Sequence, residues 1–271
     1  MVHYIRYRLT SVFHPGMMKH GGIELCNLCN LSCHDCPTPN SRVLKGFATD
    51  QTVRLALRHA EPGQVFSFHR LGEPLLHPKL VAYVGWASHM GLKPLVSTNG
   101  VLLDRGLLEA LQKAGLSILF ISLHTKKSAE SFKLAADCLL RTPIADRQFS
   151  LQGNLLTVNA QFDTWAHELG FTPEHLQFVK TIETHTWAGN VEGKQIAFDD
   201  KTVIERMNCC HFLRSNSCSV RWDGTVVSCC FDSENINVVG RILDFPNLRH
   251  QTKGYKLCRY CDSNWAIQDN H

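Results

Sequence analysis

The chain contains 271 residues, 44% of them hydrophobic, and its 28 Lys and Arg residues against 24 Asp and Glu residues give a formal net charge of +4. This content is sufficient for a sizeable core, and a small positive excess without a run of basic residues argues against a nucleic-acid partner. No apolar stretch approaches the roughly 20 residues that span a bilayer. The first residues also lack the features of a signal peptide, so we expect a cytoplasmic protein without a membrane partner.

Between residues 21 and 180, short apolar runs alternate with segments of helical periodicity. Leu107, Leu108 and Leu111 recur at helical spacing, whereas residues 118–122 alternate as a strand does. The predicted strands are 22–26, 65–69, 94–97, 117–123, 149–156 and 176–180. The predicted helices are 50–60, 79–89, 104–114, 127–140 and 161–169.

This alternation predicts parallel strands joined by right-handed crossovers. Because six such units are too few to close an eight-unit barrel, we expect an α/β fold with a partial (β/α)6 TIM-like barrel over residues 1–190. Ligands of such folds bind at the carboxyl ends of the strands. The notable residues at the predicted strand ends, in chain order, are Gly72, Glu73, Pro74, Thr98, Asn99, Gly100, Ser122, His124 and Lys180, and Asn154 lies within the fifth predicted strand.

Eleven of the 12 cysteines fall in residues 26–36 and 209–261. Such clusters, without an export signal, indicate metal or iron–sulfur ligation rather than disulfides. Cys29, Cys33 and Cys36 have C-x3-C-x2-C spacing; three thiolates can hold a cubane and leave one iron open, whereas electron-transfer clusters take four. Because Cys26 precedes this run, a four-thiolate zinc site or a fully ligated cluster is the alternative.

At this loop the sequence resembles the radical SAM superfamily. Residues 23–37 read I-E-L-C-N-L-C-N-L-S-C-H-D-C-P, similar to the family's strand with a Glu that runs into C-N-L-x-C-x-x-C-P. Cys26 stands where the family usually has another residue, and Asp35 stands where an aromatic residue is common. The resemblance implies a [4Fe–4S] cluster that is bound by Cys29, Cys33 and Cys36 and binds S-adenosylmethionine (SAM).

Three later stretches continue the resemblance. Residues 71–78, L-G-E-P-L-L-H-P, are similar to the family's G-G-E-P-L-L-H-P, which contacts the SAM amino group. Residues 97–100, S-T-N-G, and 121–124, I-S-L-H, resemble its T-N-G and I-S-L-D. The SAM-binding residues that the resemblance implies are Gly72, Glu73, Pro74, Thr98, Asn99 and Ser122, with Asn154 as a ribose contact.

After about residue 190 the pattern changes, and residues 205–271 are expected to form a small Cys-rich unit. Within it, residues 218–222 and 225–228 flank Asp223-Gly224, which predicts a hairpin. The unit resembles the SPASM/twitch extension of radical SAM enzymes, which holds auxiliary [4Fe–4S] clusters; its single late C-x2-C favours the shorter twitch form with one auxiliary cluster. A structural zinc site is the alternative. The expected ligands are Cys210, Cys229, Cys258 and Cys261, with Cys209 or Cys218 as substitutes for Cys210 and Cys230 for Cys229.

Some of the remaining residues are candidates for catalysis. A thiol that is not a ligand could return a hydrogen atom to a substrate radical, and Cys218 and Cys230 are the candidates, with a buried inert thiol as the alternative. His124 could contact the substrate or serve a hydrogen-bonded structural role. Lys180 could bind an anionic group or simply be solvated, and Cys138, inside a predicted helix, is expected in the core.

The resemblance implies an enzyme that reductively cleaves SAM to a 5′-deoxyadenosyl radical, which abstracts a hydrogen atom from the substrate. A flavodoxin or ferredoxin would be the reductant. The expected substrate is a small sugar or aminocyclitol that is oxidised or epimerised, and the alternative is a ribosomally made peptide or a protein side chain. A non-enzymatic iron–sulfur or zinc protein that carries electrons or acts as a scaffold is the alternative of another class.

Overall fold

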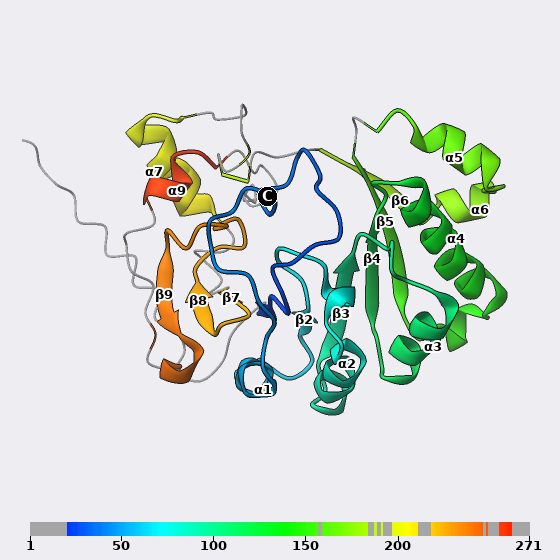
Figure 1. Cartoon of the computed structure of the whole chain (residues 1–271), viewed down its shortest axis with the longest axis horizontal. Helices are drawn as coiled ribbons and strands as arrows, with labels where there is room; N and C mark the ends of the chain where they lie inside the picture. The colour runs from blue at the N-terminus through cyan, green and yellow to red at the C-terminus, as the bar shows by residue number, and fades with distance from the viewer. Residues whose placement is uncertain are drawn as a thin grey trace, which may run out of the picture.

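The computed structural model describes residues 21–156, 159–183, 187–188, 191, 197–210, 218–245, 248 and 255–261. Over these residues the strands form one curved sheet in the order β6-β5-β4-β3-β2-β1-β7-β8-β9 (Figure 1). The strands are β1 Gly22–Ile23, β2 Val65–Ser67, β3 Lys93–Thr98, β4 Ile118–Ser122, β5 Ser150–Leu156, β6 Val179–Ile182, β7 Ser219–Val220, β8 Thr225–Val227 and β9 Val238–Arg241.

Helices connect the parallel strands and cover the outer face of the sheet (Figure 1). Asp104, Thr125 and Thr49 cap three of them, because each side-chain oxygen accepts a hydrogen bond from a backbone N–H in the first turn. The helices are α1 Asp50–Arg58, α2 Leu80–His89, α3 Arg105–Lys113, α4 Lys126–Arg141, α5 Phe162–Glu168, α6 Pro173–Leu176, α7 Asp200–Cys209 and α9 Tyr255–Cys258. None of the described helices has the length and apolar character needed to cross a membrane.

The main core lies between the sheet and these helices. Phe66 of β2, Val96 of β3 and Leu119 of β4 are fully buried there, together with Phe132 of α4. Alternate residues of the same strands face the other way, because successive side chains of a strand point to opposite faces. That inner face is therefore free to line a cavity.

The expected partial barrel of parallel strands is confirmed, since β1 to β6 are parallel throughout. The predicted sixth strand, 176–180, was placed too early. Thr172 and His175 form a capping box at the start of the short helix α6, which begins at Pro173, so β6 begins only at Val179. Lys180 therefore lies inside the strand, where it is exposed, and Ile182 is the strand's last residue.

The Cys-rich unit continues the same sheet. Its first strand, β7, pairs in parallel with β1, and Gly22 is the register partner of Ser219. The predicted hairpin around Asp223-Gly224 is confirmed, because β7 and β8 pair antiparallel and Gly224 takes a positive φ of 86°. The blue loop that follows β1 lies between this end of the sheet and β3 and β4 (Figure 1).

Candidate functional site

A cavity of about 790 Å³ opens at the carboxyl ends of the parallel strands. It brings together the cysteine loop, the polar strand ends and part of the Cys-rich unit. Of the candidate residues from the sequence, it is lined by Cys29, Cys33, Cys36, Gly72, Glu73, Thr98, Asn99, Ser122, His124, Asn154, Cys218, Cys229 and Cys230. Pro74, Cys210, Cys258 and Cys261 are not among the lining residues.

The three thiols of the cysteine loop line this cavity and lie near enough to act on one another electrostatically. Burial raises the pKa of Cys33 to about 11, and the charges of Cys36 and Cys29 add to the rise. Burial also raises the pKa of Cys29. Polar groups already surround the sulfurs: the Leu31 amide donates to Cys29 Sγ at 3.4 Å, and the Thr38 amide donates to Cys36 Sγ at 3.5 Å.

Cys26 does not share this position. Its side chain is buried, and its thiol donates to the backbone carbonyl of Glu73 at 3.1 Å and to that of Leu28 at 3.6 Å. Burial raises its pKa to about 11. Cys26 thus joins the cysteine loop to the loop after β2 and is not a lining residue of the cavity.

The loop after β2 packs directly against the start of the cysteine loop. Gly72 has a φ of 75°, and a Cβ there would lie 2.4 Å from the Cys26 carbonyl oxygen, so only glycine fits. The next amide, of Glu73, donates to the Leu28 carbonyl at 2.7 Å. Pro74 opens a short 3-10 turn, Pro74–Leu76, and so shapes the backbone beside Glu73.

Glu73 carries a buried carboxylate that is 1% exposed. Its Oε1 accepts from Thr98 Oγ1 at 2.6 Å and from the Leu75 amide at 2.9 Å, and its Oε2 accepts from the Asn99 amide at 2.8 Å. Burial raises its pKa, and these three hydrogen bonds oppose the rise. Within the described part of the chain no Lys, Arg or His forms an ion pair with it, which makes it a buried acceptor suited to a cationic ligand.

Asn99 links this carboxylate to the cysteine loop. Its side-chain amide donates to Asn30 Oδ1 at 2.8 Å and approaches Cys29 Sγ at 3.7 Å. Thr98 Oγ1 also accepts from the Gly100 amide at 2.9 Å, which fixes the turn after β3. The end of β3 therefore orients both the carboxylate and one of the three thiols.

The far wall of the cavity comes from β4 to β6. Ser122 and Asn154 are register partners on β4 and β5, and Asn154 Oδ1 accepts from Gln152 Nε2 at 2.6 Å. Burial lowers the pKa of His124, and the Asp35 carboxylate opposes that change. A neutral imidazole therefore faces the same space as the cysteine loop.

The structure adds lining residues that were not selected as site residues from the sequence. They include Arg70 after β2, Asn159 after β5 and Glu183 after β6, together with Trp187. His69, which follows β2, also lines the cavity, and its Nδ1 is buried without a hydrogen-bond partner among the described residues. For Arg70, Asn159 and Glu183, the sequence signal was only their position after strands.

A second set of thiols meets beside the cavity. Burial raises the pKa of Cys258, and so do the charges of Cys229, Cys210 and Cys261. These four cysteines are the expected auxiliary ligands, and the other three lie near enough to Cys258 for their charges to act on it, although the four are far apart in the sequence. The side chain of Cys209 lies outside the described residues.

Donor chemistry decides whether these residues fit iron–sulfur clusters. Both sets consist of thiols, and backbone amides donate to Cys29 and Cys36 in the first set and to Cys229 in the second, where Phe231 donates at 3.4 Å. Iron–sulfur clusters use such an environment. The described thiols form no disulfide. In the described residues no group of three or more Cys, His, Asp or Glu side chains is placed to hold a single metal ion.

Trp187 stands between the two thiol sets. Its indole N–H donates to the Asp35 carbonyl in the cysteine loop at 3.1 Å, and its ring meets Phe231 edge-on at 5.6 Å. Trp187 and Ala188 both have positive φ, 51° and 54°, which is uncommon for residues with side chains and costs backbone energy. Ala188, Phe231 and Leu257 form a small core of their own here, against which Cys229, Cys230 and Cys261 pack.

Comparison with known proteins identifies relatives for part of the chain. No protein-family model matches it. The PqqA peptide cyclase of Gluconobacter oxydans (strain 621H) is 33% identical over 140 residues, which are 50% of this chain and 39% of the cyclase. The chain thus matches about two fifths of that relative's length.

Solved structures match more of the chain at lower identity. BtrN in complex with AdoMet and 2-DOIA gives a TM-score of 0.59 at 17% identity and covers 94% of this chain and 96% of BtrN. SuiB of Streptococcus suis, bound to the precursor peptide SuiA, gives 0.56 at 14% identity and covers 91% of this chain and 65% of SuiB. These likenesses show the fold. The relatives and the neighbouring structures agree with the resemblance of this sequence to the radical SAM superfamily.

Proposed function

We propose that the chain reductively cleaves SAM to a 5′-deoxyadenosyl radical, which abstracts a hydrogen atom from a small sugar or aminocyclitol. The observation that carries this proposal is the buried Glu73 carboxylate beside the three-thiol loop, in one cavity. A carboxylate in a partly dry site binds an ammonium group well. The amino group of SAM is such a cation, and Thr98 and Asn99 hold the carboxylate in place for it.

The cysteine loop fits the cluster that this reaction needs. Cys29, Cys33 and Cys36 would hold it, and when bound it supplies the single electron, received from a flavodoxin or ferredoxin, that splits SAM into methionine and the radical. Asn99 would keep Cys29 and the SAM amino-acid group in register, since it contacts both Cys29 and Asn30 and its amide binds Glu73. Ser122 and Asn154, across the cavity, would bind the adenosine part.

The cavity supports a small substrate. Its volume of about 790 Å³ lies in the range of small-molecule and cofactor sites, roughly 300–1,000 Å³, so SAM leaves little space beside it. Hydroxyl, imidazole and thiol groups of Ser67, His69, Cys218, Ser219 and Ser228 line the part near β1, β2 and β7. These groups suit a ligand rich in hydroxyl or amino groups. BtrN, with its bound 2-DOIA, matches this chain over nearly its whole length.

A peptide or protein substrate is the second candidate. The PqqA peptide cyclase and SuiB, whose structure holds a precursor peptide, support it. A non-enzymatic electron carrier or scaffold is the candidate of another class. It does not explain why a carboxylate, that of Glu73, is buried beside the cysteine loop and held there by hydrogen bonds.

The reaction outcome depends on the second thiol set. Cys210, Cys229, Cys258 and Cys261 would hold an auxiliary [4Fe–4S] cluster. In a dehydrogenation such a cluster would supply an acceptor for the electron that the substrate radical loses together with a proton. In an epimerisation a thiol instead returns a hydrogen atom, and Cys218 and Cys230 are the candidate donors. Both line the cavity, and burial raises the pKa of Cys218 to about 12, so that it keeps its hydrogen at neutral pH.

Deuterium transfer tests the substrate class. Anaerobic, cluster-loaded protein is given SAM, a reductant and either aminocyclitols deuterated at the carbons that bear hydroxyl or amino groups, or deuterated peptides. We expect deuterium in 5′-deoxyadenosine only from the aminocyclitols. Deuterium only from peptides would favour the maturase. A Cys218→Ala variant and a Cys230→Ala variant, assayed for solvent deuterium in the product, would then separate epimerisation from dehydrogenation.

A further inference from the structure

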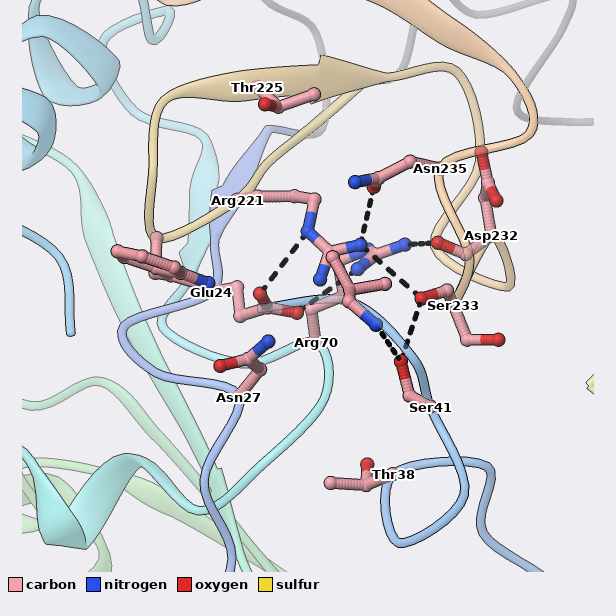
Figure 2. Close-up of polar contacts among 12 residues, drawn as sticks. Glu24, Asn27, Thr38, Ser41, Arg70, Arg221, Thr225, Asp232, Ser233 and Asn235 are labelled. Atoms are coloured by element: carbon pink, nitrogen blue, oxygen red, sulfur yellow. Dashed lines mark hydrogen bonds and ion pairs between the residues drawn. The ribbon is translucent and has the colours of Figure 1, made fainter. Parts of the chain in front are cut away.

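Two buried arginines share one carboxylate where the barrel meets the Cys-rich unit. Glu24 follows β1, Arg70 follows β2 and Arg221 follows β7, and all three side chains are fully buried (Figure 2). Arg70 Nη1 lies 3.0 Å from Glu24 Oε2, and Arg221 Nε lies 3.5 Å from Glu24 Oε1. One carboxylate oxygen therefore serves each guanidinium group.

The arginines also hold the backbone that follows β8. Arg70 Nη2 donates to the Asp232 carbonyl, and Arg221 Nη1 donates to the Ser233 carbonyl at 3.4 Å and to Asn235 Oδ1 (Figure 2). The Asp232 carboxylate is turned away from them, since it accepts from the amides of residues 236 and 237 at 2.8 and 2.7 Å. A third contact comes from the segment after the cysteine loop, where Ser41 Oγ donates to the Ser233 carbonyl at 3.4 Å.

This backbone is the turn that presents Cys229. The Asp232 amide donates to the Cys229 carbonyl at 3.3 Å, and the Phe231 amide donates to Cys229 Sγ at 3.4 Å. Two hydrogen bonds thus link Arg70 to Cys229 through one intervening residue, Asp232, although Arg70 belongs to the barrel.

The single negative charge of Glu24 does not neutralise both positive charges of Arg70 and Arg221. Arg70 Nε is buried without a hydrogen-bond partner, and so are Nε and Nη2 of Arg221. Burying a charge costs free energy unless nearby groups of opposite charge compensate it. Four thiolates and a cluster carry negative charge, and nearby charge is one of the factors that set a cluster's reduction potential.

We propose that Arg70 is a positioning residue for the auxiliary cluster. Arg70 fixes the Cys229 turn against the barrel and raises the reduction potential of that cluster. The inference rests on the proposed function, because it needs a cluster at Cys229. Glu24 limits the effect by neutralising part of the arginine charge. Removal of Arg70 and removal of the Glu24 charge therefore have opposite effects on the potential.

A redox titration followed by electron paramagnetic resonance tests this on the anaerobic protein with both clusters. Arg70→Met removes the charge and keeps the length of the side chain, so the auxiliary potential falls. Arg70→Lys keeps the charge and restores most of the potential. Glu24→Gln leaves the arginines uncompensated, so the auxiliary potential rises. The control is Arg241→Met, which leaves both potentials unchanged. Arg241 is an exposed arginine of β9 whose register partner on β8 is Thr225, and its guanidinium donates to the Asp223 carbonyl.

Iron and sulfide analysis of each variant accompanies the titration. Unchanged auxiliary potentials in Arg70→Met and Glu24→Gln, or shifts in the same direction, overturn the role of Arg70 while the proposed function stands. If Arg70→Met fails to fold, Glu24→Gln decides alone, and an unchanged or lower potential overturns it. If the wild-type protein holds only the cluster of the cysteine loop, the auxiliary site does not exist. That result overturns both this inference and the auxiliary-cluster part of the proposed function.

Discussion

Glu73 is the residue whose environment most constrains the site. Three hydrogen bonds fix a carboxylate that is otherwise buried without a described cation. Glu73→Gln keeps the shape and removes the charge. A hydrogen bond between charged groups contributes about 1.5–3 kcal/mol, so SAM should bind roughly ten- to a hundredfold more weakly. Isothermal titration of the cluster-loaded protein measures this, with Glu109→Gln on the exposed side of α3 as the control. Equal affinity in Glu73→Gln and wild type would remove Glu73 from the SAM site.

The titration of His69 makes the stability of the folded protein depend on pH. Burial lowers its pKa to about 4, and the neighbouring charge of Arg70 adds to this. The unfolded state therefore binds one more proton than the folded state between the ordinary His pKa, about 6.5, and about 4, and stability falls as the pH falls through this window. His69→Gln should flatten that part of the profile. Urea unfolding at pH 7.5 and 5.5 measures it, and an unchanged slope would contradict this account of His69.

At the scale of elements, the contact between the cysteine loop and the loop after β2 depends on Gly72. Gly63 is a matched control, because it has a φ of 83° and no atom lies within 4 Å of the place that a Cβ would take, whereas a Cβ at Gly72 meets two backbone carbonyl oxygens at 2.4 and 2.6 Å. Gly63→Ala should cost only the left-handed strain, about 1 kcal/mol, or roughly 2–4 °C in Tm. Gly72→Ala should lower Tm further. Thermal unfolding followed by circular dichroism compares the two, and equal losses would show that the loops do not pack as described.

Local sequence patterns were enough to predict most elements but not their long-range contacts. Asp104 and Thr125 cap helices, and Asp223-Gly224 turns the hairpin, through contacts within three residues, so these features follow from short stretches. The predicted sixth strand was placed too early because the Thr172–His175 capping box starts a helical turn, α6, that runs into its first residue. Arg70 was missed for another reason: its partner carbonyl at Asp232 is 162 residues away, and no pattern in one sequence shows such a pairing.

The site residues also divide into those that short motifs predict and those whose position depends on long-range contacts. Cys29, Glu73 and Asn99 were candidates because each belongs to a compact motif, and the structure brings them into one cavity. Asn159 and Trp187 lie outside any of the motifs used to place the SAM site. Their positions depend on how the strand ends and the Cys-rich unit meet.

At the scale of the whole molecule, two thiol sets lie on one continuous sheet, since β7 pairs with β1. The wild-type protein should load about eight irons and eight sulfides on anaerobic reconstitution, as two four-iron clusters. Cys258→Ala should load about four, and Cys138→Ala about eight, because Cys138 belongs to α4 and packs against the main core. About four irons in the wild type would contradict the auxiliary site, and zinc without sulfide would contradict both clusters.

The most direct test of the central claim is the formation of 5′-deoxyadenosine. Cluster-loaded protein is incubated anaerobically with SAM and dithionite, and the product is measured by mass spectrometry, beside a variant with Cys29, Cys33 and Cys36 changed to Ala. The account predicts 5′-deoxyadenosine from the wild type and none above background from the variant. Equal amounts from both proteins, or none from the wild type even with the substrate that binds its cavity, would contradict it.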